Sequence, residues 1–169
     1  YTMPVPFARF AQTAWDRVVE DCGEQPDCAE AYPDLDANFE DVLTKLHREP
    51  ARTSITRADG SVVEVEFGAG DFGYAVRGIL YNAGLTARLP GQVVAASRSG
   101  DVRQFAQATY ERSVAIRSNV LAMGLHLTIY CAEDVPRIDD AQARAAVQGT
   151  FLGEHLIEEY SNACDGWPV

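Results

Sequence analysis

The segment Cys131-Ala132-Glu133-Asp134-Val135-Pro136 places a cysteine and two adjacent carboxylates directly after an apolar stretch. A second cysteine follows later, in Cys164-Asp165-Gly166-Trp167-Pro168. A disulfide between Cys131 and Cys164 would tie the end of the apolar stretch to the last predicted helix. The arrangement of the C-terminal third of the chain therefore depends on how the cysteines pair.

The four cysteines are Cys22, Cys28, Cys131 and Cys164, and they allow three connectivities between which sequence alone does not decide. We expect nearest-neighbour pairing, because the loop from Cys22 to Cys28 is rich in turn-forming residues. A zinc site is the alternative, but C-x5-C without suitably spaced histidines is a poor zinc pattern. Disulfides indicate an oxidising compartment, so we expect a secreted or cell-envelope protein whose signal peptide lies outside this sequence.

Length and composition predict one domain over residues 1–169. The apolar fraction of 47% and the charged fraction of 23% are ordinary for a globular protein. No apolar run approaches the roughly 20 residues that cross a bilayer, so no membrane span is expected. The net charge of −11, from 14 basic and 25 acidic residues, disfavours nucleic acid as a partner. An acidic surface tolerates an amine, although it more often only faces water.

Hydrophobic periodicity predicts a mainly α fold, and β-branched residues around Asp59-Gly60 predict a hairpin that needs support from another part of the fold. Leu125, Leu127, Ile129 and Cys131 alternate with polar or aromatic residues, which indicates a short extended segment. No alternation of strands and helices typical of a nucleotide-binding core is present. One helix is expected to begin near Pro6, and the next is capped by Asp34 and ended by Pro50. Further helices begin at Gly70-Asp71 and at Asp101, the latter running towards Met123. The last two run from Asp139 to about Gln148 and from about Gly153 to Cys164.

Motifs that carry catalysis are missing from the sequence: it has no Gly-x-Ser-x-Gly elbow, no glycine-rich phosphate loop and no usual metal-ligand spacing. We therefore assign no catalytic residue, no metal ligand and no cofactor. Glu133 and Asp134 are the candidate binding residues, because two carboxylates held beside a disulfide would receive a protonated amine through charge-assisted hydrogen bonds. The alternative is that they cap the helix beyond Pro136 or face water.

Three histidines are present. His126 and His155 are candidates for acid–base work, but no triad pattern accompanies them, and His47 lies near a predicted helix end. His155, Glu158 and Glu159 share one side of a helix, which is compatible with a metal site and more typical of a solvated face.

The order of these features resembles the cap, or lid, region of secreted α/β-hydrolases of the tripeptidyl aminopeptidase and proline iminopeptidase type. The specific part is Cys-Ala-Glu-Asp-x-Pro followed by Cys-x-x-Trp-Pro, and the resemblance covers essentially all of the chain. The blocks that carry it are Ala11…Trp15-Asp16…Cys22…Cys28, Tyr32-Pro33-Asp34-Leu35, Leu80-Tyr81…Leu89-Pro90, Ser99-Gly100-Asp101, Gly124 to Pro136, and Cys164-x-x-Trp167-Pro168.

The resemblance implies a lid without a complete α/β-hydrolase core, whose nucleophile and remaining triad residues would belong to segments before Tyr1 and after Val169. It implies that the lid roofs the active site of a serine aminopeptidase, with Glu133 and Asp134 helping to recognise the free N-terminus of a peptide. The partners would be the hydrolase core and that peptide. It also implies that Tyr1 and Val169 lie on one side of the fold, with Trp167-Pro168 near the start of the first helix.

Two other classes of protein remain open from the residues themselves. The chain is alternatively a free-standing helical module that binds a small amine or peptide, or a structural domain that dimerises through its helices. An apolar underside, left exposed in the absence of a core domain, would also favour a homodimer.

Overall fold

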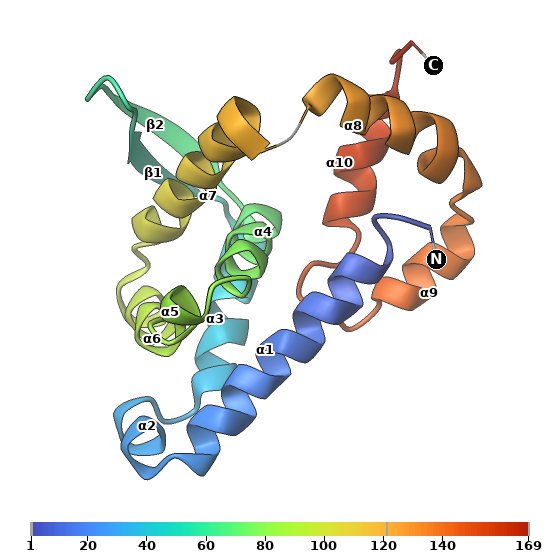
Figure 1. Ribbon diagram of the computed structural model, residues 1–169. Helices are drawn as coiled ribbons and strands as arrows, with labels where there is room; N and C mark the ends of the chain where they lie inside the picture. Colours follow the sequence, from blue (N-terminus) through green and yellow to red (C-terminus); the bar gives the residue numbers. More distant parts are fainter. Residues whose placement is uncertain (1, 121, 169) are drawn as a thin grey trace. The chain divides into compact units, whose positions relative to one another are not determined.

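The computed structural model describes residues 2–120 and 122–168 and is mainly helical (Figure 1). Within this part, ten α-helices and one two-stranded sheet form the regular structure, which confirms the predicted mainly α fold with one β-hairpin. The chain divides into two compact units, a division that the sequence did not indicate. The 14–112 unit runs from Ala14 to Arg112, and the C-terminal unit combines the residues up to Thr13 with those from Ser113 onward.

The 14–112 unit is built from seven helices and the hairpin. Pro26, at the first position of a short helix, begins regular structure where the sequence predicted only a turn-rich loop. The elements are the later part of α1 (Pro6–Glu24), α2 (Pro26–Ala31), α3 (Leu35–Arg48), β1 (Ala51–Thr56), β2 (Val62–Phe67), α4 (Ala69–Ile79), α5 (Ala83–Thr86), α6 (Leu89–Ser99) and most of α7 (Arg103–Ala115).

A row of aromatic side chains forms the core of the 14–112 unit. Trp15 stacks on Phe39 with ring centroids 4.2 Å apart. Phe72 lies 5.4 Å from Phe39 and meets the ring of Phe105 edge-on at 4.8 Å. All four side chains are fully buried, and large buried rings supply much of the stabilisation of a small core.

The predicted hairpin forms and packs on a helix. Strands β1 and β2 pair antiparallel, with Ala51 opposite Phe67, and Gly60 adopts the positive φ of 81° that favours glycine in the turn. The side chain of Gln107 on α7 accepts a hydrogen bond from the backbone N–H of Thr56 and donates one to its carbonyl. These two hydrogen bonds attach the hairpin to α7 and supply the support that an isolated hairpin lacks.

The sequence predicted helix caps at Asp34 and Asp101. Asp101 accepts a hydrogen bond from the N–H of Arg103, the first residue of α7. Asp139, predicted only as the start of a helix, also caps α9 by accepting from the N–H of Gln142. Asp34 lies at the start of α3 but has a left-handed backbone, and its side chain makes no capping bond. The cap predicted there is therefore wrong in its chemistry, although the helix begins at the next residue.

The C-terminal unit contains the first turns of α1 and the helices that follow α7. Gln12 accepts a hydrogen bond from the N–H of Phe151, and Arg9 donates to the carbonyl of Ala146. These bonds fasten α1 to residues more than 130 positions away. The remaining elements are a π-helical turn (Ile116–Val120), α8 (Met123–Ile129), a second π-helical turn, η2 (Tyr130–Asp134), a 3₁₀ turn, η3 (Val135–Arg137), α9 (Asp140–Val147) and α10 (His155–Cys164).

The extended segment expected at residues 125–131 is wrong, because α8 and η2 make this stretch helical. The alternation of apolar residues concealed a second pattern with a spacing of four, in which His126 packs on Tyr130. Thr128 also donates its hydroxyl to the carbonyl of Gly124, a bond that helical geometry permits. A short apolar run does not distinguish helix from strand, and packing decides the outcome.

In the described residues, no single helix is long and apolar enough to cross a membrane; only the bent pair 103–118 and 123–137 reaches that length and composition in combination. Tyr1 and Val169, which the resemblance implies lie on one side of the fold, are outside the described residues.

Candidate functional site

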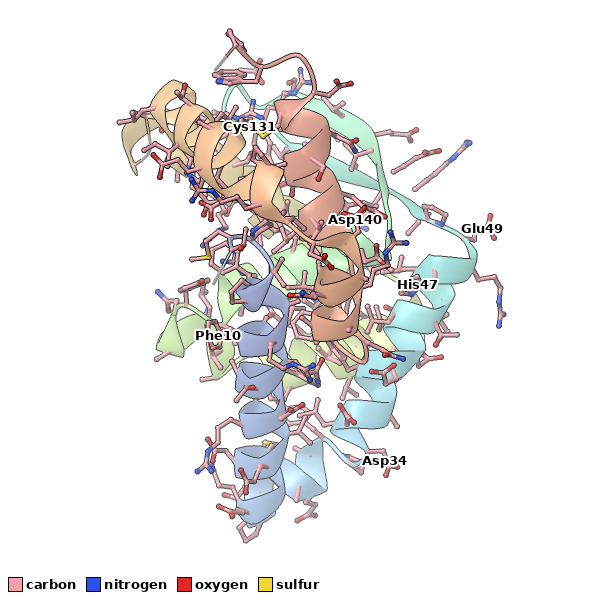
Figure 2. All side chains as sticks on the ribbon, turned by 90° about the vertical axis from the view of Figure 1, so that its right-hand side faces the viewer. Phe10, Asp34, His47, Glu49, Cys131 and Asp140 are labelled. Carbon is pink, nitrogen blue, oxygen red and sulfur yellow. A yellow bond between two sulfur atoms is a disulfide. The ribbon has the colours of Figure 1, made fainter. Side chains whose placement is uncertain are left out.

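The two sequence blocks that carry the predicted function are joined by a disulfide. Cys131 in η2 is bonded to Cys164 at the end of α10, and Cys22 is bonded to Cys28 (Figure 2). The nearest-neighbour pairing expected from the sequence is therefore confirmed. Thr128 accepts a hydrogen bond from the indole N–H of Trp167 at 3.2 Å, which draws the last described turn onto α8.

The two adjacent carboxylates have different surroundings. Asp134 is half-buried, and its Oδ1 accepts a hydrogen bond of 3.0 Å from the backbone N–H of Met3. Glu133 is exposed on η2. Asp134 thus has a structural task within the C-terminal unit, whereas Glu133 presents its carboxylate to the solvent. The sequence alone did not distinguish the two carboxylates, because the hydrogen-bond partner of Asp134 lies 131 residues away.

His126 belongs to a cluster of aromatic side chains beside the disulfide. Its Nε2 lies 2.9 Å from the hydroxyl of Tyr160, and its ring centroid is 4.3 Å from that of Tyr130. Tyr130 and Tyr160 stack on each other at 4.6 Å. Burial lowers the pKa of His126 from its ordinary value of 6.5, so the neutral imidazole is favoured near neutral pH.

Sequence reasoning missed Tyr130 and Tyr160 as neighbours of His126. The helical spacing of His126 and Tyr130 would have found one of them, but the alternation in this segment favoured an extended chain. Tyr160 comes from α10, and no local pattern connects it to α8. The cluster is a packed one in which the hydrogen-bond partner of the imidazole is a phenol, an arrangement that differs from the Ser–His–Asp triad.

The other histidines are not brought into this cluster by any observed contact. The Nδ1 of His47 lies 2.9 Å from the carbonyl of Leu43 within α3 (Figure 2). His155 begins α10 and is half-buried. Among the described residues, no group of three or more side chains is arranged to hold a metal ion. His155, Glu158 and Glu159 therefore do not form such a group.

An exposed apolar pair lies on α8. Leu125 and Ile129 are one turn apart, and 63% and 44% of their respective surfaces are exposed. Both side chains are on the helix that carries His126 and leads into η2. The disulfide segment therefore presents an apolar surface, an aromatic cluster and the exposed carboxylate of Glu133.

No family model matches this chain, and no curated protein or solved structure is similar to it at a significant level.

Proposed function

We propose that this chain is the lid of a secreted α/β-hydrolase, a serine aminopeptidase of the tripeptidyl aminopeptidase or proline iminopeptidase type. In this proposal the lid roofs the active site and helps to select peptides with a free N-terminus. The nucleophile, the base and the oxyanion hole belong to the core domain, where a rigid sheet holds them in place. The lid contributes exclusion of water and substrate selection.

The observation that carries the proposal is the convergence of its two sequence blocks. The resemblance rests on Cys-Ala-Glu-Asp-x-Pro and Cys-x-x-Trp-Pro, which are separated by a long stretch of chain. The Cys131–Cys164 bond and the hydrogen bond from Trp167 to Thr128 make them one structural unit. Two matching blocks that form one structural unit support a common origin with the hydrolase lids better than two matches in unconnected parts of the chain would.

The exposed apolar pair of Leu125 and Ile129 supports a lid that rests on another surface. Contiguous exposed apolar groups on a globular protein mark interaction sites, and a roof over an active site needs such a face towards the core. In the proposal this side of α8 faces the hydrolase core. A homodimer through the same side is the competing arrangement, and it belongs to the alternative function of a free-standing binding or dimerisation module.

Glu133 is the proposed contact for the substrate ammonium group. It is exposed, whereas Asp134 already accepts a backbone hydrogen bond. An ammonium–carboxylate pair forms short charge-assisted hydrogen bonds, and it favours substrates whose N-terminus is free. Asp134 then adds negative charge and anchors the segment on which Glu133 lies.

Secretion is part of the proposal. Two disulfides are consistent with an extracellular or otherwise oxidising environment, where such bonds persist. A lid exported together with its core would fold under the same oxidising conditions.

The genomic sequence on both sides of the segment that encodes this chain is the first test of the proposal. We expect a Gly-x-Ser-x-Gly elbow encoded upstream and an Asp…His pair downstream. The full-length protein should hydrolyse aminoacyl or tripeptidyl chromogenic substrates, and replacing its elbow serine should abolish this activity. Stop codons at both borders, or a full-length protein whose activity survives loss of that serine, would reject the lid and leave the free-standing module.

A further inference from the structure

A groove of about 560 Å³ lies within the C-terminal unit, between the beginning of α1 and the segment that leads into α9. Its walls are mainly apolar and include Val5, Phe10, Ile138 and Ala143. The volume falls within the range of about 300–1,000 Å³ that is typical of sites for small ligands. The groove contains neither Glu133 nor any residue of the aromatic cluster, so the proposed function leaves it unassigned.

Phe10 is the most conspicuous wall residue. It projects from α1 with 65% of its surface exposed (Figure 2), although its neighbours Ala8 and Ala11 on the same helix are buried. A phenyl ring exposed at the rim of an apolar groove offers a ligand the contact area that folding has left uncovered. The groove therefore favours a ligand with an apolar body.

The charge of the groove differs from that of the unit around it. Two of the unit's four basic residues, Arg9 and Arg137, line the groove. Among the ion pairs of the described residues none involves Arg137, while a hydrogen bond to the carbonyl of Ala146 holds Arg9 in position. The acidic residues of the unit outnumber these; they are Glu133, Asp134, Asp139, Asp140, Glu154, Glu158, Glu159 and Asp165.

One carboxylate does line the groove, and it is already engaged. Asp139 accepts a hydrogen bond of 2.9 Å from the N–H of Gln142, where it caps α9. The side-chain amide of Gln142 is also part of the lining and carries both a donor and an acceptor. The groove thus combines an apolar wall, two guanidinium groups and an amide.

We propose that this groove binds the carboxyl-terminal end of a peptide whose last residue is apolar. Arg137 and Arg9 pair with the terminal carboxylate, because a guanidinium forms strong, directional hydrogen bonds to carboxylates. Phe10 and Ile138 receive the last side chain. Gln142 bonds a peptide amide, which distinguishes a peptide from a fatty acid of equal charge. The inference is independent of the proposed function, since it involves other residues and the opposite end of a peptide.

The test is a titration of the isotope-labelled chain, followed by amide chemical shifts, with N-acetyl-Ala-Ala-Phe as the free acid and as its C-terminal amide. We expect the free acid to shift resonances of the groove residues and to bind about tenfold more tightly than the amide. Arg137→Gln should reduce the affinity for the acid to that for the amide. Arg144→Gln is the matched control, because Arg144 lies near Asp140 and Glu154 and does not line this groove.

The apolar wall is tested with two equally exposed residues. Phe10→Ala should weaken binding of the free acid about fivefold or more, whereas Leu125→Ala, which removes a side chain of similar exposure outside the groove, should leave it unchanged. Equal affinity for acid and amide, or shifts confined to other parts of the chain, would overturn the proposal. Octanoate that binds as tightly as the peptide would overturn the peptide as the ligand.

Discussion

The backbone N–H of Met3 donates a hydrogen bond of 3.0 Å to Oδ1 of Asp134, which joins the start of the described chain to the π-helical turn beside the Cys131–Cys164 disulfide. The bond explains why the two adjacent carboxylates have different surroundings. Asp134 is held by the fold, and Glu133 is left to the solvent. The two carboxylates can therefore be tested separately by substitution.

Asp134→Ala should lower the free energy of unfolding by about 1 kcal/mol, since a hydrogen bond to the backbone is lost. Asp134→Asn should retain most of this stability, because the amide oxygen still accepts from Met3. Urea denaturation of the two variants and the wild type measures the difference. If the Asn variant is as unstable as the Ala variant, the negative charge matters here and the hydrogen bond does not.

Removing the Cys131–Cys164 bond should cost more stability than removing Cys22–Cys28. The bonds close segments with sequence separations of 33 and 6, and chain-entropy reasoning gives losses of about 4 and about 2 kcal/mol, respectively. Double Cys→Ala variants, unfolded in denaturant, provide the comparison. An equal loss for both pairs would show that restriction of the unfolded chain is not the main contribution, and non-reducing peptide mapping checks the pairing independently.

Stability should fall in mildly acidic solution because of His126. Burial lowers the pKa of His126 in the folded protein below 6.5, so the unfolded chain binds the proton more readily. The contribution is complete above pH 6.5 and is lost as the pH falls from there towards the lowered pKa. His126→Gln should show a weaker decline than the wild type in unfolding experiments between pH 7.5 and 5. Parallel curves for the variant and the wild type would mean that His126 does not contribute.

Phe72→Ala should destabilise the 14–112 unit by about 3–5 kcal/mol, because it opens a cavity between the rings of Phe39 and Phe105. Phe10→Ala serves as the control and should change stability by less than about 0.5 kcal/mol, since Phe10 is exposed. The fluorescence of Trp15 in a Trp167→Phe background reports on this unit alone. A small effect of Phe72→Ala would show that the core collapses around the missing ring.

Much of the fold was predictable where the hydrophobic pattern and the residues that begin or end an element indicate the same structure. Pro6 and Pro50 border the first and the third helix, Asp59-Gly60 forms the hairpin turn, and α9 begins directly after Asp139. In these places the local signal and the packed structure favour the same conformation. Short turn and cap signals in sequence are reliable when a long amphipathic pattern follows them.

The rest depended on contacts between distant residues. Segment 125–131 has the alternation of a strand, but its side chains pack on α10 and it becomes helical. The tether of Asp134 to Met3 and the hydrogen bond of His126 to Tyr160 likewise join residues with no shared motif. Pairing of the cysteines is a contact between distant residues that the sequence did indicate, because few pairings were available.

We propose that Glu133 on a lid recognises the free N-terminus of a peptide, and kinetics of the full-length protein test this recognition most directly. Glu133→Gln, assayed on a tripeptidyl substrate with a free amine and on its N-acetylated form, should raise KM for the free amine about tenfold and leave the acetylated substrate nearly unchanged. Asp134→Asn should have the smaller effect. An equal change for both substrates would contradict the account, because loss of an ammonium partner cannot affect a substrate that has no ammonium group.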